Sequence, residues 1–257
     1  MTARIRDLAG KAWRYGLAAL EQPQYLPSVL WQVVVHGVHL GELLKLNRYR
    51  RWFAQAGLGT VLDVGANTGQ FASAVRAVLP SVQLYSFEPL PDCCARLRRR
   101  LERFGRFAAY NVALGDVAGV KTFQRNVFTE ASSLLKMGRA HEEAFPWARD
   151  VKTETVRVDT LDACASSLTL APRVLLKLDV QGYELKVLQG ARQTLAAITY
   201  VLVETSYQSL YEGEATFDDV YQFLKEAGFD YAGNLDQLLS PLDGSILQAD
   251  LLFVRPR

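Results

Sequence analysis

The sequence lacks the features of several common classes of protein. Its three cysteines, Cys93, Cys94 and Cys164, are too few and too unevenly spaced for a disulfide framework or a zinc site. No segment approaches the ~20 consecutive apolar residues of a membrane helix, and the nearest, residues 29–40, is interrupted by polar side chains. No compact apolar stretch with a cleavage site follows the basic N-terminus. We therefore predict a cytoplasmic protein with no membrane span and no signal peptide.

An excess of charge and a biased composition are absent as well. The 29 Lys and Arg residues against 27 Asp and Glu leave a net charge of +2, which gives no electrostatic reason to expect nucleic acid as a partner. The 257 residues are 49% hydrophobic and 22% charged, which excludes a disordered tail protein or a collagen-like repeat. This length suits one large α/β domain, alone or with an appended helical segment.

The first part of the chain differs in pattern from the rest. We predict a helical segment over residues 1–57, with a helix from about Ser28 to Arg51. One packed face is indicated by apolar residues at helical intervals, namely Leu30, Val34, Val38, Leu40 and Leu44. We interpret the segment as a lid or packing element on the main domain. A contact in a homo-oligomer and a weak membrane-surface helix are the alternatives.

In residues 58–257, short apolar runs alternate with helical patterns. The alternation predicts crossover connections, and hence an α/β fold with a mostly parallel central sheet and helices on both faces. Strands are predicted at residues 61–64, 82–87, 108–114, 174–179, 198–204 and 249–254. Helices are predicted at residues 71–79, 91–104, 185–196 and 217–227.

The stretch between residues 121 and 159 is less regular. Two extra strands, near residues 120–123 and 153–158, would flank a polar and aromatic loop at residues 126–150. A loop of this length inside a compact domain is often functional or mobile, so we weigh a substrate lid against an ordinary connection.

A glycine turn follows the first predicted strand, in the run Asp63-Val64-Gly65-Ala66-Asn67-Thr68-Gly69. Open α/β sheets bind ligands at this edge, and a glycine there lets the backbone approach a ligand closely. Asn67 replaces the second glycine of the dinucleotide fingerprint, which counts against a pyrophosphate. The acid Asp63 instead suits a ligand with positive charge near the turn.

A second acid, Glu88, ends the next predicted strand in Ser86-Phe87-Glu88-Pro89. A carboxylate at this position can accept hydrogen bonds from both hydroxyls of a ribose. Either acid alone is equally explained as a strand-end or capping residue. The pair in this strand order favours a cofactor that contains a nucleoside.

Several blocks in the same order resemble the FkbM family of S-adenosylmethionine-dependent methyltransferases. They are residues 63–69, 87–89, 111–116, 160–162, 176–184, 187–191 and 250–254. The resemblance covers roughly residues 60–255 and implies a Rossmann-like class I methyltransferase fold. The cofactor-binding residues that it implies are Asp63, Gly65, Asn67, Gly69, Glu88, Pro89, Asn111, Ala113, Ser133 and Asp179. For Ser133 the alternative is ordinary loop composition, because Ser132-Ser133 is common in loops.

Methyl transfer to a hydroxyl needs alignment of the reacting groups and benefits from a general base. Asp179 is the first candidate, because it ends a central strand at the ligand-binding edge. Glu184 and Glu204 follow, at or just beyond strand ends on the same edge. His141 lies in the irregular loop. The alternatives are a first-turn acid that favours the helix dipole for Glu184, a strand-end acid for Glu204 and a solvated histidine for His141.

One departure from the family pattern concerns Gln181. The family commonly has Asp-Val-Glu-Gly where this chain has Asp179-Val180-Gln181-Gly182. An amide keeps hydrogen-bonding groups but loses the charge of a base or metal ligand. This disfavours a divalent ion held by Asp179, Glu184 and Glu204, and we predict no metal site.

Together these patterns predict an S-adenosylmethionine-dependent methyltransferase that acts on a hydroxyl of a small molecule or glycan-type acceptor. An N-methyltransferase, an NAD-dependent oxidoreductase and a non-catalytic cofactor-binding protein are the alternatives. The six arginines between Arg96 and Arg106 are typical of a solvated helix face, with a phosphate-bearing substrate as the alternative. No motif of a nucleic-acid-binding module is present.

Overall fold

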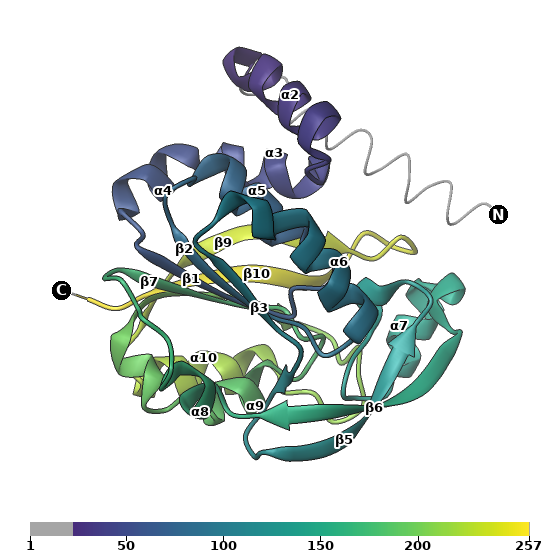
Figure 1. The fold of residues 1–257 in the computed structure, drawn as a ribbon. Helices are drawn as coiled ribbons and strands as arrows, with labels where there is room; N and C mark the ends of the chain where they lie inside the picture. The colour runs from purple at the N-terminus through teal and green to yellow at the C-terminus, as the bar shows by residue number, and fades with distance from the viewer. Residues whose placement is uncertain (1–22, 257) are drawn as a thin grey trace.

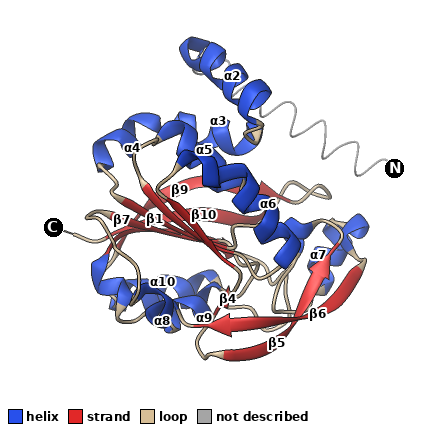
Figure 2. Cartoon of the chain, in the orientation of Figure 1, coloured by secondary structure: helices blue, strands red, loops and turns tan. Residues whose placement is uncertain are grey.

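A seven-stranded sheet forms the centre of the molecule in the computed structural model, which describes residues 23–256 (Figures 1 and 2). The strand order is β3-β2-β1-β7-β8-β10-β9. The first five strands run parallel, β10 is antiparallel to β8, and β9 is antiparallel to β10. The strands are β1 Thr60–Val64, β2 Gln83–Phe87, β3 Phe107–Tyr110, β7 Val174–Leu178, β8 Ile198–Ser206, β9 Asp230–Leu239 and β10 Ile246–Val254. The predicted α/β fold with a mostly parallel sheet is confirmed.

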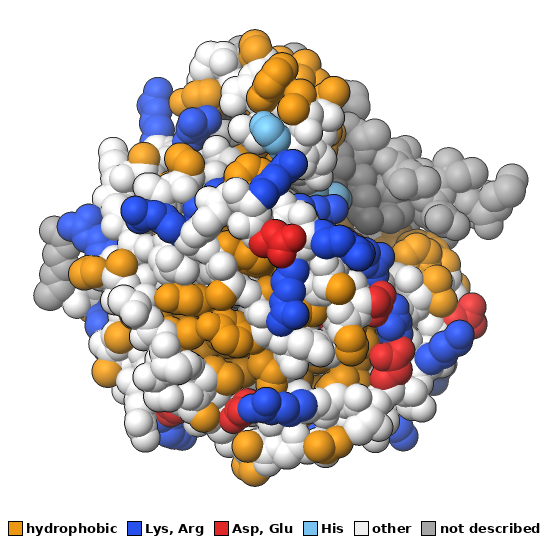
Figure 3. Space-filling view, in the orientation of Figure 1, with side chains coloured by type: hydrophobic (Ala, Val, Ile, Leu, Met, Phe, Trp, Pro, Cys, Tyr) orange, Lys and Arg blue, Asp and Glu red, His pale blue; other side chains and the backbone are white. Residues whose placement is uncertain are grey.

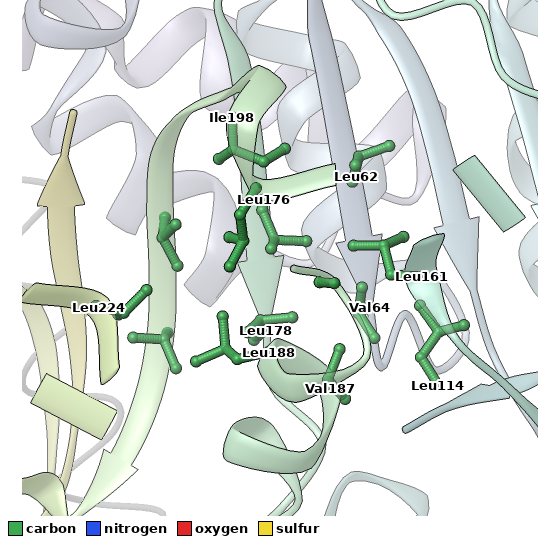
Figure 4. Close-up of a cluster of buried hydrophobic side chains, with 14 of the residues drawn as sticks. Leu62, Val64, Leu114, Leu161, Leu176, Leu178, Val187, Leu188, Ile198 and Leu224 are labelled. Atoms are coloured by element: carbon green, nitrogen blue, oxygen red, sulfur yellow. The ribbon is translucent and has the colours of Figure 1, made fainter. Parts of the chain in front are cut away.

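Helices cover both faces of this sheet, as predicted (Figure 1). One layer contains α3 Leu40–Arg48, α4 Arg50–Ala56, α5 Gln70–Val78 and α6 Pro91–Leu101, and the other contains α8 Leu161–Ala165, α9 Glu184–Gln189 and α10 Phe217–Glu226. The central strands β1 and β7 are buried at every position, which is why they read as mostly apolar runs. Figure 4 shows Val64 and Leu178 of these strands beside Val187 and Leu188 of α9.

A smaller sheet stands beside the central one, with the strand order β4-β6-β5. Its strands are β4 Ala113–Leu114, β5 Gly119–Asn126 and β6 Val151–Asp159. The last two confirm the extra strands predicted in the irregular stretch. The loop between them carries the 3-10 turn η3 Thr129–Ala131, the helix α7 Arg139–Ala144 and the 3-10 turn η4 Pro146–Ala148.

The N-terminal helical segment corrects the prediction of one helix with one packed face. After the 3-10 turn η1 Pro23–Tyr25, helix α2 Leu26–His36 ends at Gly37, whose φ of +64° is the left-handed conformation that closes helices. Residues before and after this break therefore do not share a face. Val38 and Leu44 are buried, but Leu30 and Val34 are 59% and 80% exposed. Residues 1–22 lie outside the described part of the chain.

Three further boundaries differ from the prediction. The strand expected at residues 108–114 is divided between β3 and β4, which belong to different sheets. The helix expected at 185–196 ends before Gly190, and the 3-10 turn η5 Thr194–Ala197 follows it. The helix expected at 91–104 finishes as the 3-10 turn η2 Glu102–Phe104.

Strand β9 was not predicted at all. It lies at the edge of the sheet, much of it is exposed, and register shifts interrupt its pairing with β10. An exposed and irregular edge strand shows no regular apolar alternation, and that alternation is the signal a sequence offers.

Candidate active site

A cavity of about 870 Å³ opens along the carboxyl edge of the parallel strands. This volume lies within the ~300–1,000 Å³ typical of small-molecule sites. Gly65, Glu88, Asp179 and Glu204, at or just beyond the ends of four neighbouring strands, line it. Its other walls come from α3, from the loop at residues 126–150 and from β9 and β10. Segments far apart in sequence thus meet around one space.

Close packing requires glycine at two positions of the turn after β1. Gly65 has a φ of +79°, and a Cβ atom there would lie 1.8 Å from the carbonyl oxygen of Asp179. A Cβ atom on Gly69 would lie 2.7 Å from Cδ1 of Leu97 on α6. Both positions therefore require glycine. Gly65 lines the cavity, whereas Gly69 supports the turn from behind.

Glu88 connects this turn to the end of β2. Its Oε2 accepts a hydrogen bond from the backbone N–H of Asn67 and its Oε1 one from that of Leu90, both at 2.8 Å. The side chain amide of Asn111 donates to the backbone oxygens of Glu88 and Pro89 and so fixes the strand end. Burial raises the pKa of Glu88 to about 7, despite these two hydrogen bonds. Each carboxylate oxygen keeps a lone pair for a further donor from the cavity.

Lys177 on β7 is a charged residue of the site that sequence reasoning missed. Its Nζ lies 3.6 Å from Oδ1 of the fully buried Asp63 and 3.2 Å from Oδ2 of Asp179. Burial acts to lower the pKa of Lys177, but the two carboxylates raise it above the usual value. A lone lysine in the buried strand Val174–Leu178 was the available signal, because a buried ammonium needs a charged partner.

The two acids on either side of this lysine occupy different environments. Asp63 also accepts a hydrogen bond from the hydroxyl of Ser86, and it does not line the cavity. Burial raises the pKa of Asp63 although Lys177 opposes the shift. For Asp179, burial is outweighed by Lys177 and by a hydrogen bond from Gln181, so its pKa is lowered. Asp179 is therefore ionised and faces the cavity at neutral pH.

Gln181 bridges two carboxylates of the cavity wall. Its Nε2 donates to Oδ1 of Asp179 at 2.8 Å and to Oε2 of Glu204 at 2.6 Å. The hydroxyl of Tyr211 donates to Oε1 of Gln181 at 2.7 Å, which fixes the orientation of the amide. Burial and the nearby Asp179 raise the pKa of Glu204 well above its usual value. The pKa values of the two carboxylates are thus shifted in opposite directions, that of Asp179 down and that of Glu204 up.

Glu184 lies behind the cavity wall, at the start of α9. Its Oε1 accepts hydrogen bonds from the backbone N–H groups of Val180 and Gly182, at 2.8 and 3.3 Å. Burial raises its pKa to about 8. These contacts brace the turn that carries Asp179 and Gln181.

His141 lines the cavity from α7, rather than being exposed on a loop. Its ring packs against Phe145 and Tyr211, with centroids 5.1 and 5.4 Å apart, and its Nδ1 is buried without a hydrogen-bond partner. Burial lowers the pKa of His141 to about 4, so the imidazole is neutral at neutral pH.

The predicted site residues divide between the cavity wall and the layer behind it. Those in the wall are Gly65, Asn67, Glu88, Pro89, Ala113, His141, Asp179 and Glu204. Asp63, Gly69, Asn111, Ser133 and Glu184 are not in the wall. Ser133 donates from its hydroxyl to the backbone oxygen of Gln181. The binding and catalytic roles of all these residues stay predictions.

A charged cluster on the far wall was also missed. Lys45 of α3 lies 2.8 Å from Asp250 of β10 and 3.3 Å from both Glu42 and Asp236. Burial acts to lower the pKa of Lys45, but these carboxylates, Asp250 first, raise it well above its usual value. Gln248, on the same strand as Asp250, donates a hydrogen bond to Glu204 at 3.2 Å. This bond connects the cluster around Lys45 with the acids at the strand ends. No motif in the sequence connects α3 with β9 and β10, so only the fold brings them together.

The cavity wall also contains polar atoms without protein partners. Nδ2 of Asn67 and Oε1 of Gln70 are buried and make no hydrogen bond within the protein. Buried polar groups in a wall of this kind are normally satisfied by a ligand or water. A ligand with ribose hydroxyls and polar amino-acid groups, such as S-adenosylmethionine, fits these atoms together with Glu88. Within residues 23–256, no three His, Cys, Asp or Glu side chains are grouped to hold a metal ion.

Comparison with known proteins gives two informative relatives. The chain is 30% identical over 160 residues to the 2-O-methyltransferase NoeI of Sinorhizobium fredii, which covers 60% of this chain and 66% of that protein. It is 26% identical over 145 residues to the hexuronic acid methyltransferase AglP of Haloferax volcanii, covering 55% and 54% of the two chains. The chain therefore spans about half to two thirds of the length of these relatives.

The chain is also similar to solved structures and to a family model. The N-terminal domain of EvdMO1, determined with SAH and D-fucose, superposes with a TM-score of 0.46 at 11% identity, covering 83% of each chain. The model of the methyltransferase FkbM domain matches residues 63–231. This match confirms the family, the class I methyltransferase fold and the S-adenosylmethionine cofactor predicted from the sequence. The chain belongs to the FkbM family of methyltransferases.

Proposed function

We propose that this protein transfers a methyl group from S-adenosylmethionine to a hydroxyl of a small molecule or glycan-type acceptor. The observation that carries the proposal is the ionised Asp179, which faces the cavity between the Glu88 turn and the charged wall of α3, β9 and β10. The names of the two relatives, a 2-O-methyltransferase and a hexuronic acid methyltransferase, support a sugar hydroxyl as the acceptor.

In this proposal the Glu88 side of the cavity holds the cofactor. The carboxylate of Glu88 would accept hydrogen bonds from the ribose hydroxyls, and the side chain amide of Asn67 would donate to the bound molecule. Pro89 and Ala113 would contribute the wall beside the adenine. When bound, the cofactor supplies an electrophilic methyl group on a sulfonium.

Asp179 would then accept the proton of the acceptor hydroxyl as the general base. Lys177 and Gln181 keep it ionised and hold its orientation. Glu204, which lines the cavity and has a raised pKa, could hydrogen bond to another hydroxyl of the acceptor. The charged cluster around Lys45 offers both donors and acceptors at the position where a polyhydroxylated molecule would lie.

The cofactor role of Glu88 gives a prediction about binding. Replacing Glu88 with Gln should weaken binding of S-adenosylhomocysteine by roughly 10- to 100-fold, because a hydrogen bond to a charged group contributes about 1.5–3 kcal/mol. Since the pKa of Glu88 is about 7, the wild-type affinity should rise as the pH increases through 7, and the variant should lose this dependence. Calorimetric titration measures both effects.

The same titration separates the alternative functions. NAD serves as the comparator ligand, and saturable binding of NAD in place of S-adenosylhomocysteine would contradict the proposal. An acceptor screen that begins with sugars and glycans then tests catalysis. Binding of the cofactor without turnover of any hydroxyl or amine acceptor would favour a non-catalytic protein.

Gln181 gives a second prediction, about the pH dependence of turnover. Gln181→Glu places a third carboxylate within hydrogen-bonding distance of Asp179 and Glu204. Their repulsion should raise the pKa of Asp179, so the acidic limb of the kcat/KM profile should move up by about one pH unit or more. At acidic pH, below the shifted pKa of Asp179, the rate should fall about tenfold for each such unit, whereas at neutral pH it should change little because Asp179 stays ionised there.

The matched control for this change is Gln222→Glu, which adds the same charge at an exposed position of α10. Its pH profile should coincide with that of the wild type. An unchanged profile in Gln181→Glu would instead show that the amide does not control the ionisation of the base.

The proposal also includes a cytoplasmic location, because the three cysteines are unpaired and Cys93 and Cys94 are buried. In the described part of the chain, no helix is both long and apolar enough to cross a membrane.

A further inference from the structure

Helix α2 presents an apolar face to solvent. Leu30, Trp31, Val34 and Val35 are 59%, 60%, 80% and 49% exposed. Their spacing places them in one stripe along the helix. The opposite side is also apolar, and there Val29 is buried in the core shared with α3 and α5. A helix that is apolar on all sides is normally covered on all sides, so the exposed stripe lacks a partner in the described structure.

The surroundings of this stripe are basic. No Asp, Glu, Lys or Arg occurs from Gln22 to Gly41. At one end of α2, the guanidinium of Arg50 lies 5.0 Å from the ring of Tyr25. At the other end, His36 contacts Phe104, next to the arginine-rich end of α6. Exposed arginines follow these contacts in the chain: Arg51 is next to Arg50, Arg103 packs on the ring of Phe104, and Arg99 and Arg106 lie within five residues of Phe104. Figure 3 shows hydrophobic side chains over α2 at the top of the molecule, with Lys and Arg side chains below them.

We propose that the exposed stripe of α2 and the arginines around it bind an anionic lipid surface. Apolar side chains that include a tryptophan can enter the boundary between headgroups and acyl chains, while arginines attract anionic headgroups. The helix has 11 residues, far fewer than the ~20 needed to span a bilayer, which suits a helix lying on the surface. Because α3 follows α2 directly and lines the cavity, this contact would hold the active site next to the membrane.

A second copy of the chain fits this face less well. A stripe on one helix of about 16 Å, at 1.5 Å per residue, offers much less than the ~800 Å² that each partner buries in a stable dimer. The arginines at both ends would also face those of a second copy. An anionic surface has neither disadvantage.

Co-sedimentation with vesicles tests the proposal. The full chain should bind vesicles of phosphatidylcholine mixed with phosphatidylglycerol, bind much less to phosphatidylcholine alone, and lose affinity at high salt. Val34→Asp should weaken binding about tenfold or more, because it places a charge in the inserted stripe. Replacing Arg99 and Arg103 with Gln should weaken it roughly fivefold for each charge removed.

Two control variants match these changes away from the stripe. Val120→Asp alters a side chain that is 70% exposed on β5, and Arg139→Gln removes an exposed charge from α7. Both should bind like the wild type, and thermal melting should show that every variant is folded. Absence of vesicle binding, or full binding by Val34→Asp, would overturn the proposal. So would a stable dimer in light scattering that Val34→Asp dissociates while no vesicle binding occurs.

Discussion

Asp179→Asn should reduce kcat for methyl transfer by about 10²- to 10⁴-fold, the usual contribution of a general base. The amide has nearly the same shape as the carboxylate but cannot take up the proton of an acceptor hydroxyl. Its oxygen can still accept the hydrogen bond from Gln181, and Lys177 keeps Asp63 as its partner. The variant should therefore remain folded and bind S-adenosylhomocysteine with nearly wild-type affinity. Single-turnover kinetics and calorimetry measure the two properties separately.

Asp116→Asn is the matched control. Asp116 also pairs with a lysine, Lys186, at 2.9 Å, but it lies outside the cavity. Its removal should leave kcat unchanged. If Asp179→Asn retains full turnover, the base must be another group, and His141, neutral at neutral pH, would be tested next.

Lys177→Met should lower the free energy of unfolding by about 3–5 kcal/mol, the range for removing one partner of a buried ion pair. Methionine preserves most of the apolar stem, whereas the contact of Nζ with the ring of Phe71, 5.4 Å from the ring centroid, is lost. The ammonium is lost, and the fully buried Asp63 then has only the hydroxyl of Ser86 as a hydrogen-bond donor. Urea denaturation at neutral pH measures the change.

The pH dependence of this loss identifies its cause. The pKa of Asp63 is already raised in the folded protein, and without Lys177 it should rise further. An acid with a raised folded pKa destabilises the protein at pH values above its unfolded pKa, and the cost falls as the pH drops and the folded state takes up the proton. The defect of Lys177→Met should therefore be smaller at mildly acidic pH. Combining it with Asp63→Asn should restore part of the stability.

Lys186→Met provides the comparison at the surface. The side chain of Lys186 is 48% exposed in its pair with Asp116, and such pairs contribute about 0–1 kcal/mol. Equal losses in the two lysine variants would show that the pairing of Lys177 with Asp63 does not stabilise the core.

The central strands and the order of their acids were readable from the sequence because each depends on local pattern. Strands β1 and β7 are buried on both faces, so they appear as short apolar runs between helical segments. Parallel strands bring their carboxyl ends to one edge, so the strand pattern alone predicts that Glu88 and Asp179 meet there. The family blocks then indicated the cofactor.

The helical segment and β9 were harder to predict because their signals are ambiguous. Apolar residues at helical spacing suggested one long helix, but Gly37 adopts a left-handed conformation and divides it. The sequence alone does not show whether a glycine in such a pattern will be tolerated or will end the helix. Tertiary packing makes that choice, by burying Val38 while leaving Val34 exposed.

By itself, the sequence determined the fold class, the family and the edge of the sheet where the ligand site lies, since periodicity, glycines and strand-end acids are local features. Only the tertiary structure decided which side chains meet across that edge. Lys177 touches Asp63 because β1 and β7 are adjacent and in register. Gln181 reaches Glu204 on β8 and Tyr211 in the loop that follows β8. These contacts set the protonation of the acids, and residues distant in sequence make them only once the sheet has formed.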